Sequence, residues 1–312
     1  MNLPGGGGEI VVVGSLNIDT FLAVQKLPNP GETVLAQDLL FRAGGKGFNQ
    51  AIAAAKSGGK VRLVGALGEQ EYLFEELLKS HHASSEGLVR KKGPTGQAFI
   101  EVDAPGENRI VVVSGANALL LPEDMTALGE LGSKQKTVLL SQNEIPEQTV
   151  EEAFKIAKSY GWTTVLNAAP ARAISEKLLT LTQILICNRI EAEDLLGMEI
   201  KDPGSAHEEV KKLLASGPEI FIITLGALGA VLFTHERVIQ YGSFPVHPID
   251  TTGAGDAFCG GFVAELSRGN DLEACLNYGL AAGALATTRP GSSDASPTHG
   301  EILELLRSAG RV

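Results

Sequence analysis

The chain has 312 residues, of which 44% are hydrophobic and 20% charged, a composition typical of a globular protein with a sizeable buried core. Its formal net charge of -11 argues against nucleic acid as the main partner, because phosphate backbones attract basic surfaces. No apolar run approaches the ~20 residues of a membrane helix, and the three cysteines form no CxxC pair. We therefore expect a reduced, cytoplasmic protein with inert thiols, no zinc site and no membrane contact.

The N-terminal part predicts the first strands and helices of an α/β protein. Residues 1–8 are rich in glycine and are expected to be a flexible lead-in. Residues 10–13 and 61–68 predict buried strands, because each is a short apolar run. Residues 44–57 carry an alanine-rich face and predict a helix, and residues 70–80 predict another.

Two segments depart from this pattern. Residues 21–41 contain short apolar runs and the turn PNPG, which indicates antiparallel strands rather than a crossover helix. Residues 95–102 and 108–114 predict a hairpin around the turn DAPGE. We expect the two insertions, approximately 16–42 and 96–115, to form one small antiparallel sheet.

From about residue 122 onward, helices and strands alternate regularly. The strands are expected at 137–142, 163–170, 183–188 and 219–226, with a late hairpin at 230–242. The helices are expected at 122–131, 146–160, 175–181, 189–197, 208–217, 254–267, 271–287 and 299–309. Continuous apolar strands between helices imply a mostly parallel sheet covered on both faces. The fold class is therefore three-layer α/β/α, with residues 10–312 as a single domain.

Polar or glycine residues follow several of the predicted strands. In open α/β sheets, ligands bind beyond the carboxyl ends of the strands. The residues at these positions are Asn17, Asp19, Glu144, Asn167, Asn188, Glu191, Thr224 and Gly226. Any one of them could be a plain turn residue, but together they open onto one rim.

The stretch GGKGFNQA, residues 44–51, is a second cluster of polar and glycine residues. Its glycines let the backbone approach a ligand, and the helix start offers free N–H donors. Gly47 rather than Ser or Thr follows Lys46, so this is not a Walker phosphate loop. A helix start with a solvated lysine explains the stretch equally well.

The stretch DTTGAGDAFCGG, residues 250–261, places three small residues before Asp256 at a helix start. Successive N–H groups and the helix dipole there make a pocket for an anion. Asp256 could be only a favourable charge in the first turn of a helix. However, an acid beside an anion pocket also has the arrangement that phosphoryl transfer needs, since it can accept a hydroxyl proton.

In this order along the chain, a set of motifs resembles the ribokinase-like family of sugar kinases. They are GSLNID (14–19), PGET (30–33), GGKGFNQA, GENRIVVVSGAN (106–117), NAAPA (167–171), CNRIEAE (187–193), ITLGALG (223–229) and DTTGAGDAFCGG. The resemblance covers about residues 10–305. It implies an α/β domain with a β-sheet lid, MgATP as phosphoryl donor and D-ribose as acceptor, giving D-ribose 5-phosphate.

The resemblance also implies roles for individual residues. Asp256 is the expected base for the 5-hydroxyl, and the expected anion hole is Gly253, Ala254 and Gly255. The expected ribose contacts are Asn17, Asp19, Gly45, Lys46, Asn49 and Glu144. The expected nucleotide contacts are Asn188, Thr224, Leu225, Gly226, Gly229, Gly255 and Asn277. Asn188 and Glu191 are expected to serve magnesium through water. An activating potassium ion is expected at Asp250, Thr252, Ala286, Arg289 and Gly291.

Three positions depart from the family pattern. Ala295 lies where a serine is common, so an oxygen of the potassium site could be missing unless Ser296 replaces it. Glu69 lies where the family more often has Asp, and Asn143 lies where leucine is usual. We expect neither of the last two to abolish activity.

Other interpretations remain. One is a kinase of the same family acting on fructose, 2-keto-3-deoxygluconate, adenosine or pseudouridine, and another is a non-catalytic sugar-binding relative. Phe21, Phe41 and Phe99 could be platforms for a nucleoside or simply the core of the lid. A dinucleotide-dependent dehydrogenase is disfavoured, because no GxGxxG follows the first strand. The exposed face of the lid suggests a homodimer.

Overall fold

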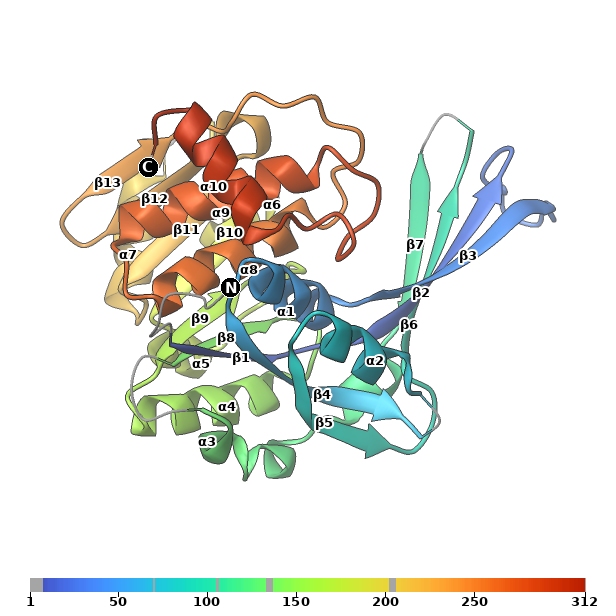
Figure 1. Ribbon diagram of the computed structural model, residues 1–312, viewed down its shortest axis with the longest axis horizontal. Helices are drawn as coiled ribbons and strands as arrows, with labels where there is room; N and C mark the ends of the chain where they lie inside the picture. Colours follow the sequence, from blue (N-terminus) through green and yellow to red (C-terminus); the bar gives the residue numbers. More distant parts are fainter. Residues whose placement is uncertain (1–7, 70, 105–106, 133–136, 202–205, 312) are drawn as a thin grey trace.

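The computed structural model describes residues 8–69, 71–104, 107–132, 137–201 and 206–311 (Figure 1). A nine-stranded sheet with the order β13-β12-β11-β10-β9-β8-β1-β4-β5 forms the centre of the molecule. Its strands are β1 (Glu9–Val13), β4 (Lys60–Gly68), β5 (Ser84–Lys91), β8 (Val138–Gln142), β9 (Thr163–Asn167), β10 (Ile184–Asn188), β11 (Ile220–Thr224), β12 (Ala230–Thr234) and β13 (Val238–Tyr241). All neighbours from β5 to β11 pair in parallel, and β12 and β13 add an antiparallel edge.

Helices cover both faces of this sheet, which confirms the three-layer prediction. One face carries α1 (Lys46–Lys56), α2 (Leu73–Ser80), α8 (Ala254–Ser267), α9 (Leu272–Ala286) and α10 (His299–Ser308). The other carries α3 (Leu128–Leu131), α4 (Glu147–Ser159), α5 (Glu176–Leu181), α6 (Arg189–Leu196) and α7 (His207–Ala215). None of the helices in the described ranges is both long and apolar enough to span a membrane.

The strand β1 shows why the central strands read as continuous apolar runs. All five of its residues are buried. Ile10 and Val12 join the core beneath α1 and α8, whereas Val11 and Val13 join the core beneath α4. Since successive side chains alternate between two covered faces, neither face of the strand needs polar residues.

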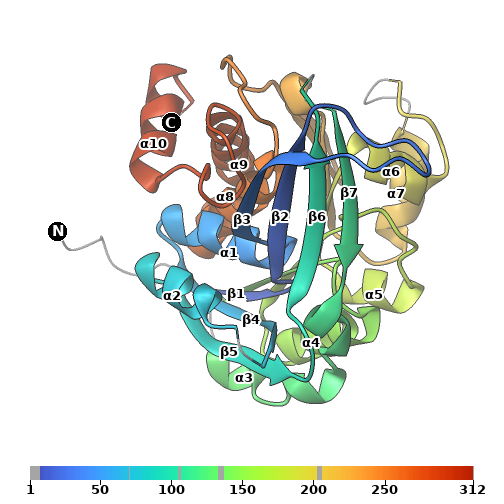
Figure 2. The same ribbon diagram turned by 90° about the vertical axis from the view of Figure 1, so that its right-hand side faces the viewer.

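A second sheet of four strands projects from this body (Figures 1 and 2). It consists of β2 (Asn17–Val24), β3 (Ala36–Gly44), β6 (Gly96–Val102) and β7 (Asn108–Val113), in the order β3-β2-β6-β7. We call it the lid sheet. The turn between β6 and β7 falls partly on residues outside the described ranges.

The small sheet is antiparallel at its two hairpins, as predicted, but its two central strands differ from the prediction. The pairs β2–β3 and β6–β7 are antiparallel hairpins, but β2 and β6 pair in parallel, with Asn17 opposite Gly96. The reason is that both strands leave the main body at the same place, so they run in the same direction. The hairpins are local in sequence, whereas their pairing joins segments about 80 residues apart and has no sequence signal.

Two other local predictions differ from the structure. The edge strand β5 was missed, because the sequence SSEGLVRK is only half-buried and has no apolar run. Residues 122–131 form a 3₁₀ turn, Pro122–Met125, and the four-residue helix α3 rather than one helix. The predicted lead-in lies outside the described residues except for Gly8, whose N–H donates to the carbonyl of Ser267 at 2.7 Å.

Candidate active site

The helices α1 and α8 begin close together at the carboxyl ends of the central strands. Helix α1 begins against the exit of β1, and a Cβ at Gly47 would lie 2.5 Å from the backbone N of Ser15. Gly253 precedes α8 with φ of 72°, a left-handed conformation that favours glycine. In both stretches the glycine is therefore needed by the fold itself, for close packing against Ser15 at Gly47 and for a left-handed conformation at Gly253.

Asp256 lies in the first turn of α8 and is 7% exposed. Its Oδ2 accepts a hydrogen bond from Asn49 Nδ2 at 3.2 Å, and its Oδ1 accepts one from Gln50 Nε2 at 2.9 Å. Burial raises the pKa of Asp256, against the lowering effects of the Lys46 ammonium and the Gln50 hydrogen bond. This carboxylate is buried among specific polar partners, which a plain capping charge would not require.

Two buried glutamines that sequence reasoning missed lie behind Asp256. Gln50 in α1 and Gln142 at the end of β8 are both fully buried. Gln142 Nε2 donates to Gln50 Oε1 at 2.7 Å, and Gln50 Nε2 also donates to Asn167 Oδ1 at 2.9 Å. The available signal was a glutamine inside an alanine-rich helix face and another at the end of the run TVLLSQ.

Charged groups of both signs surround the Asp256 carboxylate. Burial acts to lower the pKa of Lys46, but Asp256, Glu144 and Glu191 outweigh it and raise that pKa. Burial, together with Glu144 and Asp256, raises the pKa of Asp19 to about 7. Glu144 Oε2 accepts hydrogen bonds from Ser15 Oγ at 2.5 Å and from the Lys46 backbone N–H at 2.9 Å. The structure thus brings these predicted sugar contacts into one cluster.

Asn17 completes this cluster at the start of the lid sheet. It is buried, and its Oδ1 accepts from Asn117 Nδ2 at 2.8 Å. Asn117 also bonds the backbone N–H and C=O of Leu16, at 3.0 and 3.1 Å. Asn117 is therefore a residue that joins the two insertions, and sequence reasoning gave it no role.

A cavity of ≈ 180 Å³ lies in front of Asp256. Gly253 and Gly255 at the start of α8, Lys46 and Glu191 are among the residues that line it. The helix N-terminus supplies partial positive charge there. The arrangement suits a small anionic group held between backbone N–H groups and a buried carboxylate.

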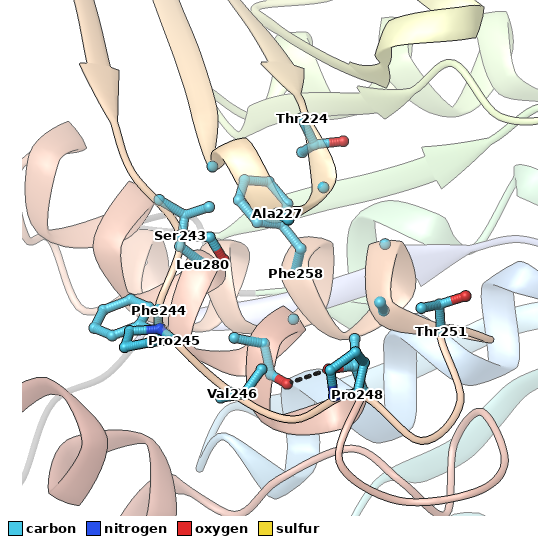
Figure 3. A pocket seen from close by; sticks show the side chains of 17 residues that line it. Thr224, Ala227, Ser243, Phe244, Pro245, Val246, Pro248, Thr251, Phe258 and Leu280 are labelled. Atoms are coloured by element: carbon cyan, nitrogen blue, oxygen red, sulfur yellow. Dashed lines mark hydrogen bonds between the residues drawn. The ribbon is translucent and has the colours of Figure 1, made fainter.

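A larger cavity of ≈ 520 Å³ adjoins it and shares Thr224, Gly255 and Phe258 (Figure 3). Most of its wall is apolar and comes from α8, α9 and the loop before α8. Its lining residues are Thr224, Gly226, Ala227, Gly229, Ser243, Phe244, Pro245, Val246, Pro248, Thr251, Ala254, Gly255, Phe258, Leu280, Gly283, Ala284 and Thr287. Such a volume with few polar groups suits a planar heterocycle.

The predicted nucleotide residues divide between this cavity and a neighbouring one. Thr224, Gly226 and Gly229 line the 520 Å³ cavity, whereas Leu225 and Asn188 line a cavity of ≈ 300 Å³ that also contains Thr224 and Gly226. Asn277 lines neither of them. The loop residues 243–248 gave no sequence signal, because proline and valine in a loop carry no mark of ligand contact.

Asn188 and Glu191 have a local structural role as well as a place at the site. They form a reciprocal cap on α6, in which Glu191 N–H donates to Asn188 Oδ1 at 2.9 Å and Asn188 N–H donates to Glu191 Oε2 at 2.8 Å. Burial, ahead of Asp256, raises the pKa of Glu191, while the backbone bond and Lys46 lower it. Both residues line the 180 Å³ cavity, and amide and carboxylate oxygens are groups to which a magnesium ion can bind through water.

The residues predicted to hold potassium lie in the loop before α8, at the end of α9 and in the loop after α9. Asp250 joins the two loops. Its Oδ1 accepts from the Thr252 N–H at 2.9 Å and its Oδ2 from the Gly291 N–H at 2.8 Å. A carboxylate with surrounding backbone carbonyls is a donor set that a potassium ion accepts. Arg42 from the lid sheet also approaches, since a Cβ at Gly291 would lie 2.5 Å from its Nη1.

The three departures from the family pattern lie in different surroundings. Ala295 and Ser296 are buried, and the Ser296 carbonyl accepts from Lys56 Nζ at 3.1 Å. Asn143 is buried behind the site, where its N–H donates to the Ala169 carbonyl at 2.8 Å. Glu69 is exposed and lines none of the three cavities.

Comparison with known proteins identifies the family. Residues 8–299 match the model of the pfkB family of carbohydrate kinases. The chain belongs to the pfkB carbohydrate kinase family. This confirms the resemblance drawn from the motifs and the expectation of a kinase-type α/β fold.

Several pfkB family members are similar over nearly the whole chain. A ribokinase from Haemophilus influenzae is 38% identical over 96% of this chain and 99% of its own length. A ribokinase from Staphylococcus aureus is 34% identical over 94% of this chain and 98% of its own length. The structure of Arabidopsis thaliana ribokinase complexed with ribose and ATP superimposes with a TM-score of 0.89 and 30% identity, covering 97% of this chain and 99% of that one.

Proposed function

We propose that this protein is an ATP-dependent kinase that transfers the γ-phosphate of ATP to the 5-hydroxyl of D-ribose, giving D-ribose 5-phosphate and ADP. The observation that carries the proposal is the position of Asp256. Its buried carboxylate lies at a 180 Å³ cavity that continues into a 520 Å³ cavity large enough for a nucleotide base and sugar. The similarity to ribokinases over the full chain supports the substrate.

In this mechanism Asp256 is the general base. The sugar oxygen forms a bond to the γ-phosphorus while the bond between that phosphorus and the β–γ bridging oxygen breaks. The proton of the hydroxyl passes to the Asp256 carboxylate. The N–H groups at Gly253, Ala254 and Gly255 stabilise charge on the transferring phosphoryl group. Lys46, with a raised pKa, stays cationic and adds to this stabilisation.

The sugar is proposed to bind on the lid side of Asp256. Ribose carries mostly hydroxyl groups, so its pocket must offer several polar partners. Asp19 and Glu144 supply acceptors, and Asn17, Lys46 and Asn49 supply amide or ammonium donors. Gly45 is proposed to contact the sugar through its backbone, since a Cβ there would lie 2.9 Å from the backbone N of Asn17. Closure of the lid sheet would exclude water, so that ATP is not hydrolysed.

Two cations are proposed to assist. Magnesium, bound through water to Asn188 and Glu191, would neutralise charge on the ATP phosphates. Potassium is proposed at the loops that Asp250 joins, beside the start of α8, where it would hold the anion hole in shape. Asp250, Thr252, Ala286, Arg289 and Gly291 supply its oxygen atoms. Asn277 is proposed to act behind the adenine pocket rather than at its surface.

A homodimer through the lid sheet is also proposed. By strand register, Phe41, Thr20, Phe99 and Val111 lie side by side across all four strands, on the face opposite Asp19. Phe41 is 61% exposed and Val111 is 63% exposed, so neither is lid core. Thr20 lies between the two phenylalanines of this row, and the other three side chains are apolar. A mostly apolar row on a sheet face is best covered by the same row of a second copy. The buried free thiols of Cys187, Cys259 and Cys275 suit a cytoplasmic location.

The test is ADP release over a panel of acceptors, with and without magnesium and potassium. We expect kcat/KM to be highest for D-ribose, above 2-deoxyribose, fructose and adenosine. If another acceptor is better, the protein is a different kinase of the family. If ribose binds tightly but no ADP forms, it is a non-catalytic sugar-binding relative.

A further inference from the structure

The two fully buried glutamines behind Asp256 have no evident structural purpose. Gln50 lies on a face of α1 that otherwise buries glycine, alanine, phenylalanine and isoleucine besides Asn49. Gln142 ends the fully buried strand β8, in which it follows three apolar residues and Ser141. A buried carboxamide is costly unless its donors and acceptors are paired. Because both glutamines are nevertheless buried, their hydrogen-bond partners indicate their role.

The hydrogen-bond pattern allows one orientation of the Gln50 amide. Asn167 Nδ2 donates to the Ile186 carbonyl at 3.1 Å, so Asn167 Oδ1 faces Gln50. Gln50 must then present its NH₂ group to both Asn167 Oδ1 and Asp256 Oδ1. If the amide were reversed, three acceptor oxygens would face one another without a proton, and the Gln142 NH₂ would face a second NH₂.

Gln142 holds this orientation from the other side. Its Nε2 donates to Gln50 Oε1 at 2.7 Å, whereas its own Oε1 is buried without a hydrogen-bond partner among the described residues. Gln142 therefore leaves one polar atom unpaired while keeping its donor on Gln50. We call this series of hydrogen-bonded side chains, Gln142–Gln50–Asp256, the glutamine relay.

The glutamine relay makes the two oxygens of Asp256 different. Oδ1 accepts a 2.9 Å bond from the Gln50 NH₂ group, whose orientation is fixed by its bonds with Asn167 and Gln142. The Asn49 amide is not fixed in this way, because its own Oδ1 is buried without a hydrogen-bond partner among the described residues. Oδ2 has a single longer bond, 3.2 Å, to Asn49 Nδ2. We propose, on the basis of the kinase function above, that Gln50 and Gln142 are positioning residues which reserve Oδ2 of Asp256 as the atom that takes the proton of the acceptor alcohol.

The relay also favours the charged form of the base. The Gln50 hydrogen bond lowers the pKa of Asp256 against burial, the largest effect, which raises it. The other charged or titratable groups facing Asp256 are Lys46 on α1, Glu144 after β8, Asp19 on β2, Glu191 on α6 and Cys259 on α8. Substitution of Gln50 leaves all of them in place, so a change in the pH profile reports the relay.

The experiment compares Gln50→Met and Gln142→Met with a control, Gln183→Met. Methionine keeps the length of the side chain but lacks the amide. Gln183 precedes β10 at the opposite end of the strands, where its Oε1 accepts from the Thr164 N–H at 3.3 Å. The measurements are kcat/KM for ribose between pH 5 and pH 9, ribose affinity by calorimetry and melting temperature.

For Gln50→Met we expect kcat to fall by about ten-fold to a hundred-fold and the acid limb of the pH profile to move up by about one unit. Ribose affinity should stay within about three-fold of wild type. Gln142→Met should shift the limb in the same direction by less, because Gln50 keeps its bond to Asp256 and loses only the donor on its Oε1. This second variant keeps the test valid if Gln50→Met does not fold. Gln183→Met should leave the profile unchanged.

An acid limb that coincides with wild type in both relay variants would overturn the proposal, whatever the change in kcat. A loss of ribose affinity parallel to the loss of kcat would also overturn it, since the glutamines would then shape the sugar pocket. Failure of the kinase function is distinguishable, because wild-type protein would then release no ADP with any acceptor.

Discussion

The Nδ2 atom of Asn49 donates to the Oδ2 atom of Asp256 at 3.2 Å, joining α1 to α8 across 207 residues of sequence. One residue is an expected sugar contact and the other the expected base. Their contact means that the helix carrying the proposed sugar contacts also orients the proposed base.

Substitution of the base is the most direct test of the mechanism. Asp256→Asn keeps the size and the Asn49 and Gln50 neighbours but cannot accept the proton. We expect turnover to fall by ~10²–10⁴, while ribose affinity measured by calorimetry stays close to wild type. A variant that retains near-normal turnover would exclude Asp256 as the base.

The anion hole can be tested by two glycine substitutions that differ in their cost to the fold. A Cβ at Gly255 would meet no heavy atom within 4 Å, whereas at Gly253, with φ of 72°, it would lie 2.7 Å from Ser292 Cα. Gly255→Ala should keep its melting temperature but lose turnover, because the methyl group enters both cavities. Gly253→Ala should also lose about 1 kcal/mol or more of stability. Full activity of Gly255→Ala would contradict the assigned phosphate position.

The raised pKa of Asp19, about 7, predicts how stability depends on pH. An unfolded Asp titrates near ~4, so between these values the folded state holds a proton that the unfolded state has lost. Stability therefore falls as pH rises from about 4 to 7. Asp19→Asn removes this effect and should stabilise the sugar-free protein by about 1–2 kcal/mol at pH 8 but not at pH 4. Denaturant titrations at both pH values measure it.

The control for this prediction is Asp38→Asn, which removes an exposed carboxylate from the same lid sheet. The effect of Asp38→Asn on the free energy of unfolding should be small and the same at pH 4 and pH 8. Equal effects of Asp19→Asn at pH 4 and pH 8 would mean that the Asp19 carboxyl is not perturbed in the folded protein.

Lys56 at the end of α1 binds the loop that follows Gly291. Its Nζ donates to the carbonyls of Ser293, Asp294 and Ser296 at 3.1, 2.9 and 3.1 Å. Because hydrogen bonds from a charged group contribute about 1.5–3 kcal/mol, Lys56→Met should destabilise the protein by about 2 kcal/mol, measured by denaturant unfolding. It should also raise the potassium concentration needed for half-maximal activity. Lys56→Arg keeps the charge and should lower the stability by less than Lys56→Met does. An unchanged stability of Lys56→Met would show that the loop is held by other contacts.

The proposed dimer depends on the outer face of the lid sheet. Phe99→Asp places a charge in the middle of the row that contains Phe41 and Val111. We expect light scattering to show a dimer for wild type and a monomer for this variant. Leu35→Asp, at a fully solvated position between β2 and β3, is the matched control and should remain dimeric. A wild-type monomer at micromolar concentration would contradict the proposal.

The sequence by itself determined the alternation of strands and helices, the glycine-rich starts of α1 and α8, and the family. These features are local. Two adjacent apolar residues such as Val11 and Val12 indicate a strand that is buried on both faces. Gly253 indicates a turn, because its own backbone adopts a left-handed conformation. Asp256 could be selected because the small residues before it are its sequence neighbours.

Only the tertiary structure decided the parallel pairing of β2 with β6, the partners of Asp256 and the wall of the larger cavity. Gln50, Gln142 and Asn117 could not be recognised in the sequence, because an amide side chain shows its role only through the atoms it bonds. Those atoms lie 92 residues apart for Gln50 and Gln142 and 206 apart for Gln50 and Asp256. Chain folding, rather than any local pattern, brings them within hydrogen-bond distance.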